Sequence, residues 1–245
     1  MWSQHFLAGV ALLASSNSGI VNAASQLNKP GQDVVVLLHG MGRSTLSMKR
    51  IEWALVNRGY RVVNVGYPST LHSVEQLARS HLAPALRDLD LPSGGRVHFV
   101  THSLGAILLR QQLAMEPMPN LGRVVMLGPP NRGSELAEGW KRKFWYRLAT
   151  GPSGQQVGTG ERDLPRALGP AQFEVGVIAG DRSLNPIFSR ILPGPDDGKV
   201  AVAATRLEGM ADFTVVHTSH TGLPCRKIVI QQVISFLETG RFSKP

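Results

Sequence analysis

The chain has few of the features that would place it in a specialised class of proteins. Cys225 is the single cysteine in 245 residues, so neither an internal disulfide nor a metal cage of cysteines can form. Its neighbours Pro224 and Arg226 do not suggest an activated thiol. Long hydrophobic runs are also missing, because the apolar stretch from Phe6 to Ala14 is much shorter than the roughly 20 residues that span a membrane.

Acidic residues are the minority charge. The sequence holds 26 Lys and Arg against 17 Asp and Glu, a formal net charge of +9. Such an excess suits an anionic surface. However, the basic residues are scattered, and no zinc finger, aromatic RNA-binding signature or basic heptad accompanies them. These absences argue against a nucleic-acid partner.

One basic cluster is interleaved with aromatic residues. Trp140, Phe144, Trp145 and Tyr146 alternate with the cations of the segment 141–147. A cationic, aromatic segment of this kind can lie on an anionic lipid surface. Peripheral contact with an anionic membrane is therefore one interpretation, and packing of the aromatics onto the domain with the charges in water is the more common one.

Residues 1–23 are a candidate signal peptide. The small residues Val21 and Ala23 would permit cleavage after Ala23, which would export the protein to the periplasm or the medium. The segment from Met1 to His5 has no Lys or Arg, which argues against a signal, and without cleavage the protein would be cytoplasmic. The remaining residues, 24–245, are predicted to form a single domain.

Strand-like and helix-like segments alternate after Pro30, which predicts an α/β fold with a mostly parallel central sheet flanked by helices. The continuous apolar run from Asp33 to His39 is typical of a strand buried on both faces. The stretch 131–172 is weakly patterned and is predicted to be a lid-like insertion. The other expected strands cover about 60–65, 96–100, 123–127, 174–179 and 213–216, and the expected helices cover 47–58, a segment from 73, 106–115 and 225–239.

The most informative motif is Thr101-His-Ser-Leu-Gly105. It follows a strand-like run and precedes a helix-forming segment, which is the sequence form of a nucleophile elbow. The usual pattern begins with glycine, and here Thr101 stands in that place. Capping of the helix by Ser103 is the simpler alternative.

A catalytic serine needs a base, and the base needs an orienting acid. Only His217 and His220 follow Ser103 in the chain, and we favour His220 because it lies in the loop before the last helix. His217 follows Val216 directly and could belong to the strand. His102 is expected to line the site rather than to act as the base.

The acid is expected after the strand at 174–179. Asp197 is favoured because Asp197-Gly-Lys-Val200 places a carboxylate at a turn, whereas Asp181 closes a strand and remains a second candidate. Asp196 and Asp212 are weaker alternatives. Each of these carboxylates could instead form a solvated Asx turn.

An oxyanion requires backbone donors, for which the amides of Met41 and Leu104 are the candidates. The segment His39-Gly-Met-Gly42 lacks the Gly-Lys-Ser/Thr ending of a P-loop. His39 and His102, which neighbour these groups, are predicted to contact the substrate.

Taken together and in order, these motifs resemble the α/β-hydrolase superfamily, and more narrowly its bacterial lipases and esterases. The resemblance covers about Asp33 to Phe242. It implies Ser103 as nucleophile, Asp197 as acid and His220 as base, with Met41 and Leu104 supplying the oxyanion amides. The further segments that carry it are Gly59-Tyr-Arg-Val-Val-Asn64, Tyr67-Pro-Ser69 and Leu127-Gly-Pro-Pro-Asn-Arg-Gly-Ser134.

We expect hydrolysis of carboxylic esters, lipid esters included, through an acyl-serine, with no cofactor and no metal. The same triad serves thioester or amide cleavage and acyl transfer, and the sequence does not separate these. A catalytically silent module that binds an acyl ligand is the alternative from another class.

Overall fold

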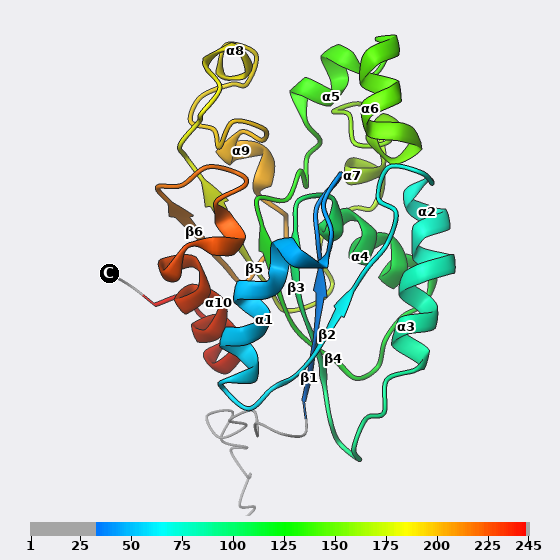
Figure 1. The fold of residues 1–245 in the computed structure, drawn as a ribbon, viewed down its shortest axis with the longest axis vertical. Helices are drawn as coiled ribbons and strands as arrows, with labels where there is room; N and C mark the ends of the chain where they lie inside the picture. The colour runs from blue at the N-terminus through cyan, green and yellow to red at the C-terminus, as the bar shows by residue number, and fades with distance from the viewer. Residues whose placement is uncertain (1–32, 244–245) are drawn as a thin grey trace, which may run out of the picture.

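The computed structural model describes residues 33–243, which form a six-stranded sheet covered by helices on both faces (Figure 1). The candidate signal peptide, 1–23, lies outside the described residues and stays a prediction. All five strand pairs are parallel, and the order is β2-β1-β3-β4-β5-β6, as the alternating pattern predicted. The strands are β1 (Val34–Leu38), β2 (Arg61–Val65), β3 (Val97–His102), β4 (Leu121–Leu127), β5 (Val175–Gly180) and β6 (Asp212–Val216).

The central strands are apolar along their whole length because both faces are buried. In β1, the side chains of Val34, Val36 and Leu38 pack into the core on one face. Val35 and Leu37 pack into the core on the other face. Alternation along an extended strand therefore feeds two separate cores.

Each core has its own set of helices. One face carries α2 (Val74–Leu77), the π-helical turn η2 (Ala78–Leu82), α3 (Ala83–Arg87) and α4 (Leu104–Met115). The other face carries the 3-10 turns η1 (Thr45–Met48) and η3 (Leu223–Cys225) with α1 (Lys49–Val56) and α10 (Lys227–Thr239). This division closes the core and leaves the carboxyl ends of the strands free for a site.

The weakly patterned stretch 131–172 contains three helices that the sequence did not reveal: α5 (Glu135–Trp140), α6 (Phe144–Gln155) and α7 (Leu164–Ala167). In α6 the helix is interrupted at Gly151, with φ 60° and ψ −161°, and Pro152 follows. Only glycine fits there, since an added Cβ would lie 1.5 Å from the carbonyl oxygen of Thr70. The break obscures the helical periodicity.

Two further short helices were not predicted, namely α8 (Pro186–Ser189) and α9 (Val202–Thr205). Figure 1 shows that α5, α6 and α8 project beyond the carboxyl ends of the strands. They stand over the edge of the sheet where the predicted catalytic residues lie. Within residues 33–243, none of the helices has the length and apolar character required to cross a bilayer.

Candidate active site

Ser103 occupies a sharp turn between β3 and α4. Its φ of 53° and ψ of −119° make it the one non-glycine residue with positive φ between 33 and 243. Such a conformation costs about 1–3 kcal/mol and persists only where the surroundings enforce it. The Ser103 side chain makes no capping hydrogen bond to α4, so capping does not explain this serine.

The residues around the turn explain how it closes. An added Cβ at Gly105 would lie 2.7 Å from the Leu38 carbonyl oxygen, so the start of α4 packs on β1 only if this position is glycine. Thr101 is still within β3, paired with Leu38 and Met126, and is fully buried. Because the positive φ falls on Ser103 and not on Thr101, the elbow does not require glycine at its first position.

His220 and Asp197 form a buried pair. Nδ1 of His220 lies 2.7 Å from Oδ2 of Asp197. The other carboxylate oxygen of Asp197 accepts hydrogen bonds from the backbone N–H groups of Lys199 (3.0 Å) and Val200 (2.9 Å). The carboxylate is thereby fixed by its own turn, and Nε2 is the ring nitrogen of His220 that remains for another partner.

The alternative residues lie elsewhere or have other partners. His217 pairs with Asp181 at 2.9 Å, and this histidine is exposed at the end of β6. Asp196 accepts from the Gly198 N–H and from Ser189, whereas Asp212 accepts from the N–H groups of Phe213 and Phe242. None of these four residues lines the pocket described below.

His102 packs beside His220, with ring centroids 4.8 Å apart. Its Nε2 donates to the carbonyl oxygen of His220 at 3.0 Å, so the loop that carries His220 is tied to β3. Burial first, and then the charge of His220, lowers the pKa of His102 well below its ordinary value. The ring is therefore neutral, and its buried Nδ1 has no hydrogen-bond partner.

His39 does not contact the pocket, contrary to the prediction that it binds substrate. It is buried, its ring stacks on Tyr67 at 4.1 Å, and its carbonyl oxygen accepts a hydrogen bond from the Tyr67 hydroxyl. These contacts shape the loop after β1. The sequence could not distinguish a histidine beneath this loop from one on its surface.

That loop brings Met41 to the wall of the pocket that the start of α4 also lines. Gly40 approaches so closely that an added Cβ would lie 3.2 Å from Cβ of Ser103. Leu104 is the first residue of α4, so its N–H has no acceptor one turn earlier in the helix. Both candidate oxyanion residues therefore line the same pocket as Ser103.

The pocket has a volume of about 240 Å³ and contains Ser103, His102 and His220 in its wall. Its apolar part comes mainly from α5 and α6 and from their neighbours. The side chains in this part are Leu136, Ala137, Trp140, Trp145, Tyr146, Val157 and Phe188. An elongated apolar group fits this lining.

Sequence reasoning missed several wall residues. Phe188 comes from the unpredicted helix α8, while Arg43 and Lys199 each lie two residues beyond a predicted site residue. Their spacing from Met41 and Asp197 was the signal available in the sequence. Within residues 33–243, no group of three or more His, Cys, Asp or Glu side chains could hold a metal ion.

The sheet is parallel, and a serine with positive φ occupies the turn at its carboxyl edge. An acid and then a histidine follow this serine along the chain. This is the architecture of α/β hydrolases. The chain belongs to the Alpha/beta hydrolase family, whose sequence model matches residues 35–230.

Solved structures with the same fold include lipases and esterases. A Bacillus licheniformis lipase in propeptide form has 18% identity and a TM-score of 0.67, over 89% of this chain and 52% of that one. A metagenomic carboxyl esterase has 17% identity and a TM-score of 0.64, over 78% and 65%. A Paleococcus ferrophilus monoacylglycerol lipase has 15% identity and a TM-score of 0.56, over 86% and 96%. The chain thus spans about half the length of that propeptide form. No curated protein matches the sequence.

Proposed function

We propose that the protein hydrolyses carboxylic esters through an acyl intermediate on Ser103. The observation that carries the proposal is the strained Ser103 turn in a pocket wall shared with His220, whose Nδ1 is 2.7 Å from Asp197. His220 takes the serine proton as Ser103 attacks the carbonyl carbon, and Asp197 stabilises the imidazolium that forms. The amides of Met41 and Leu104 stabilise the oxyanion.

Collapse of the tetrahedral species breaks the ester C–O bond, and His220 returns its proton to the leaving alcohol. A water molecule then attacks the acyl-serine with His220 as base, which releases the acid and restores Ser103. The apolar wall from α5 and α6 suits an acyl chain. Similarity to lipases and a carboxyl esterase supports an ester substrate over a thioester or an amide.

A fluorophosphonate probe and a panel of p-nitrophenyl esters test the proposal. The wild-type protein should be labelled on Ser103, identified by peptide mass, and Ser103→Ala should lose labelling and about 10⁴-fold or more of kcat. Ser235→Ala, which removes a hydroxyl from α10, is the matched control and should behave as wild type. Turnover that survives in Ser103→Ala would exclude Ser103 from the reaction.

We also propose that the surface around the pocket mouth contacts an anionic lipid surface. Phe144, Trp145 and Leu148 are exposed on α6, while Leu184 and Ile187 are exposed on the segment of α8. The rings of Trp140 and Phe188, 5.1 Å apart, join the two segments. The cations of 141–147 border these apolar side chains, which is the pattern of an interfacial segment.

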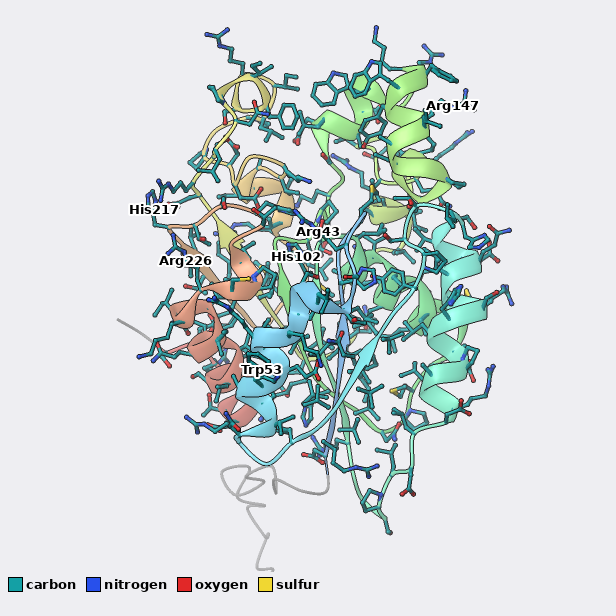
Figure 2. All side chains as sticks on the ribbon, in the orientation of Figure 1. Arg43, Trp53, His102, Arg147, His217 and Arg226 are labelled. Carbon is teal, nitrogen blue, oxygen red and sulfur yellow. The ribbon has the colours of Figure 1, made fainter. Side chains whose placement is uncertain are left out.

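Two exposed tryptophans allow a matched test of the lipid surface. Trp145 on α6 is 54% exposed, and Trp53 on α1 is 64% exposed. Figure 2 shows Trp53 far from Arg147, which lies in the first turn of α6 close to Trp145. Co-sedimentation with vesicles of phosphatidylcholine and phosphatidylglycerol should fall about tenfold in Trp145→Ser and stay unchanged in Trp53→Ser. Equal loss in both variants would exclude this orientation on the bilayer.

A further inference from the structure

The charged side chains of the pocket wall are all cationic. In the part of the chain that the structure describes, Arg43 and Lys199 line the pocket and no Asp or Glu does. Arg43 follows the loop that carries Met41, and Lys199 follows Asp197 by two residues. Both cations therefore come from the loops that hold the reacting groups, and Figure 2 shows Arg43 beside His102.

Neither cation is in direct contact with an acidic side chain in the part of the chain that the structure describes. Among residues 33–243, Arg43 and Lys199 make no side-chain hydrogen bond or ion pair, whereas Lys141 near the same pocket bridges Glu138 and Asp163. The acid that acts on Lys199 is Asp197, but its oxygens already accept from His220 and from two backbone amides. Asp197 therefore attracts Lys199 without contacting it, and two cations face one buried carboxylate, so positive charge is in excess at this end of the pocket.

The two cations also act on each other. Burial around its ammonium group, followed by the charge of Arg43, lowers the pKa of Lys199. The same two charges contribute to the lowered pKa of His102, after burial and the charge of His220. Two like charges that converge on the residue before the nucleophile repel, and an anion bound between them relieves that repulsion.

We infer that Arg43 and Lys199 select esters that carry an anionic group, a phosphate or a carboxylate, on the alcohol side of the scissile bond. The inference rests on the proposed function. The apolar side chains from α5 and α6 suit the acyl chain, whereas Arg43 and Lys199 lie on the loops of Met41 and Asp197, beside the reacting groups, where the alcohol leaves. His220, which protonates the leaving alcohol, lines the same pocket as Lys199. The product alcohol is then itself an anion.

The inference is tested with hexanoate esters of three alcohols, namely glycerol, glycerol 3-phosphate and 3-hydroxypropanoate. Each ester is used at concentrations below those at which it aggregates. At low salt, kcat/KM for the phosphate ester should exceed that for the glycerol ester about tenfold, and 0.5 M NaCl should reduce the ratio. The 3-hydroxypropanoate ester shows whether a carboxylate is accepted as well as a phosphate.

Variants that remove one positive charge test whether Arg43 and Lys199 cause the preference for the phosphate ester. In Arg43→Gln and Lys199→Gln the ratio of kcat/KM between phosphate ester and glycerol ester should fall about three- to tenfold, and Arg43→Lys should retain most of it. Arg79→Gln on η2 and Lys227→Gln on α10 remove the same charge outside the pocket and should keep the wild-type ratio.

A binding readout does not depend on turnover of the anionic ester. Glycerol 3-phosphate should inhibit hydrolysis of the glycerol ester competitively, and its inhibition constant should rise in Arg43→Gln and Lys199→Gln. Cleavage of the glycerol ester with no preference for phosphate or carboxylate overturns the inference and leaves the proposed function intact. Failure to cleave any of the three esters contradicts the proposed function itself.

Discussion

Two Asp–His pairs lie near the carboxyl ends of β5 and β6, and they differ most in burial. The side chains of His220 and Asp197 are 6% and 0% exposed, whereas those of His217 and Asp181 are 75% and 34% exposed. In the sequence, the histidines are three residues apart and both acids follow the same strand. The order of residues predicted the candidates and favoured His220 and Asp197, but the burial that distinguishes the two pairs depends on how the loops fold, which the sequence does not contain.

The two pairs provide a matched comparison of carboxylates. Asp197→Asn should reduce kcat/KM for p-nitrophenyl butyrate by about 10⁴-fold, because His220 loses the group that orients and stabilises it. Asp181→Asn removes the same charge from the exposed pair and should leave the activity within twofold of wild type. Equal losses in the two variants would contradict the assignment of Asp197 as the acid.

Thr101 lowers the stability of the folded protein, because its side chain buries a polar group in the elbow. Its hydroxyl is buried in β3 and has no hydrogen-bond partner. Thr101→Val keeps the shape and should raise the free energy of unfolding by about 1 kcal/mol in urea titrations. The control is Thr205→Val, because the buried Thr205 hydroxyl donates to the Val202 carbonyl and its loss should lower stability by a similar amount. A drop in stability for Thr101→Val would show that the hydroxyl has a partner in solution.

At the scale of elements, prediction succeeded where a segment has one uninterrupted period. The buried run of β1 and the helical spacing of α10 are such segments, and their observed bounds differ from the predicted ones by one or two residues. Prediction from the sequence failed in α6, where Gly151 and Pro152 break the helix, and in α8, which has only four residues. These elements are held by contacts with distant segments, which a local pattern does not contain.

A capping box formed by Ser73 and Gln76 begins α2. The Ser73 hydroxyl accepts from the Gln76 N–H at 3.2 Å, and the Gln76 side chain accepts from the Ser73 N–H at 3.0 Å. Ser73→Ala should lower the free energy of unfolding by about 0.5–2 kcal/mol. Ser44 stands at the start of η1 without a side-chain cap, so Ser44→Ala should have no measurable effect. Similar losses in both variants would mean that the capping bonds contribute nothing.

For the molecule as a whole, the buried side chains on the two faces of the sheet include histidines as well as apolar residues. Burial lowers the pKa values of His39, His98 and His102. His98 is typical: its Nδ1 accepts from the Arg123 N–H at 2.8 Å, and its Nε2 lies 3.2 Å from Asp33. The neutral ring with a proton on Nε2 satisfies both contacts, whereas protonation of Nδ1 breaks the first.

These depressed pKa values predict how stability depends on pH. For His98 burial dominates, the charges of Arg123 and Arg96 act in the same direction, and Asp33 opposes them. The unfolded chain binds the proton at an ordinary pKa near 6.5 and the folded chain only at lower pH, so stability is complete above about 6.5 and falls on acidification.

Urea titrations between pH 7.5 and 5.0 measure this dependence. Below about pH 6.5, each of these histidines should reduce the free energy of unfolding by up to about 1.4 kcal/mol per pH unit. His98→Gln is less stable at neutral pH because it loses buried contacts, but it should show a shallower decline because one proton-binding group is gone. Parallel curves for His98→Gln and wild type would mean that His98 is already protonated in the folded protein, with Asp33 outweighing burial and the two arginines.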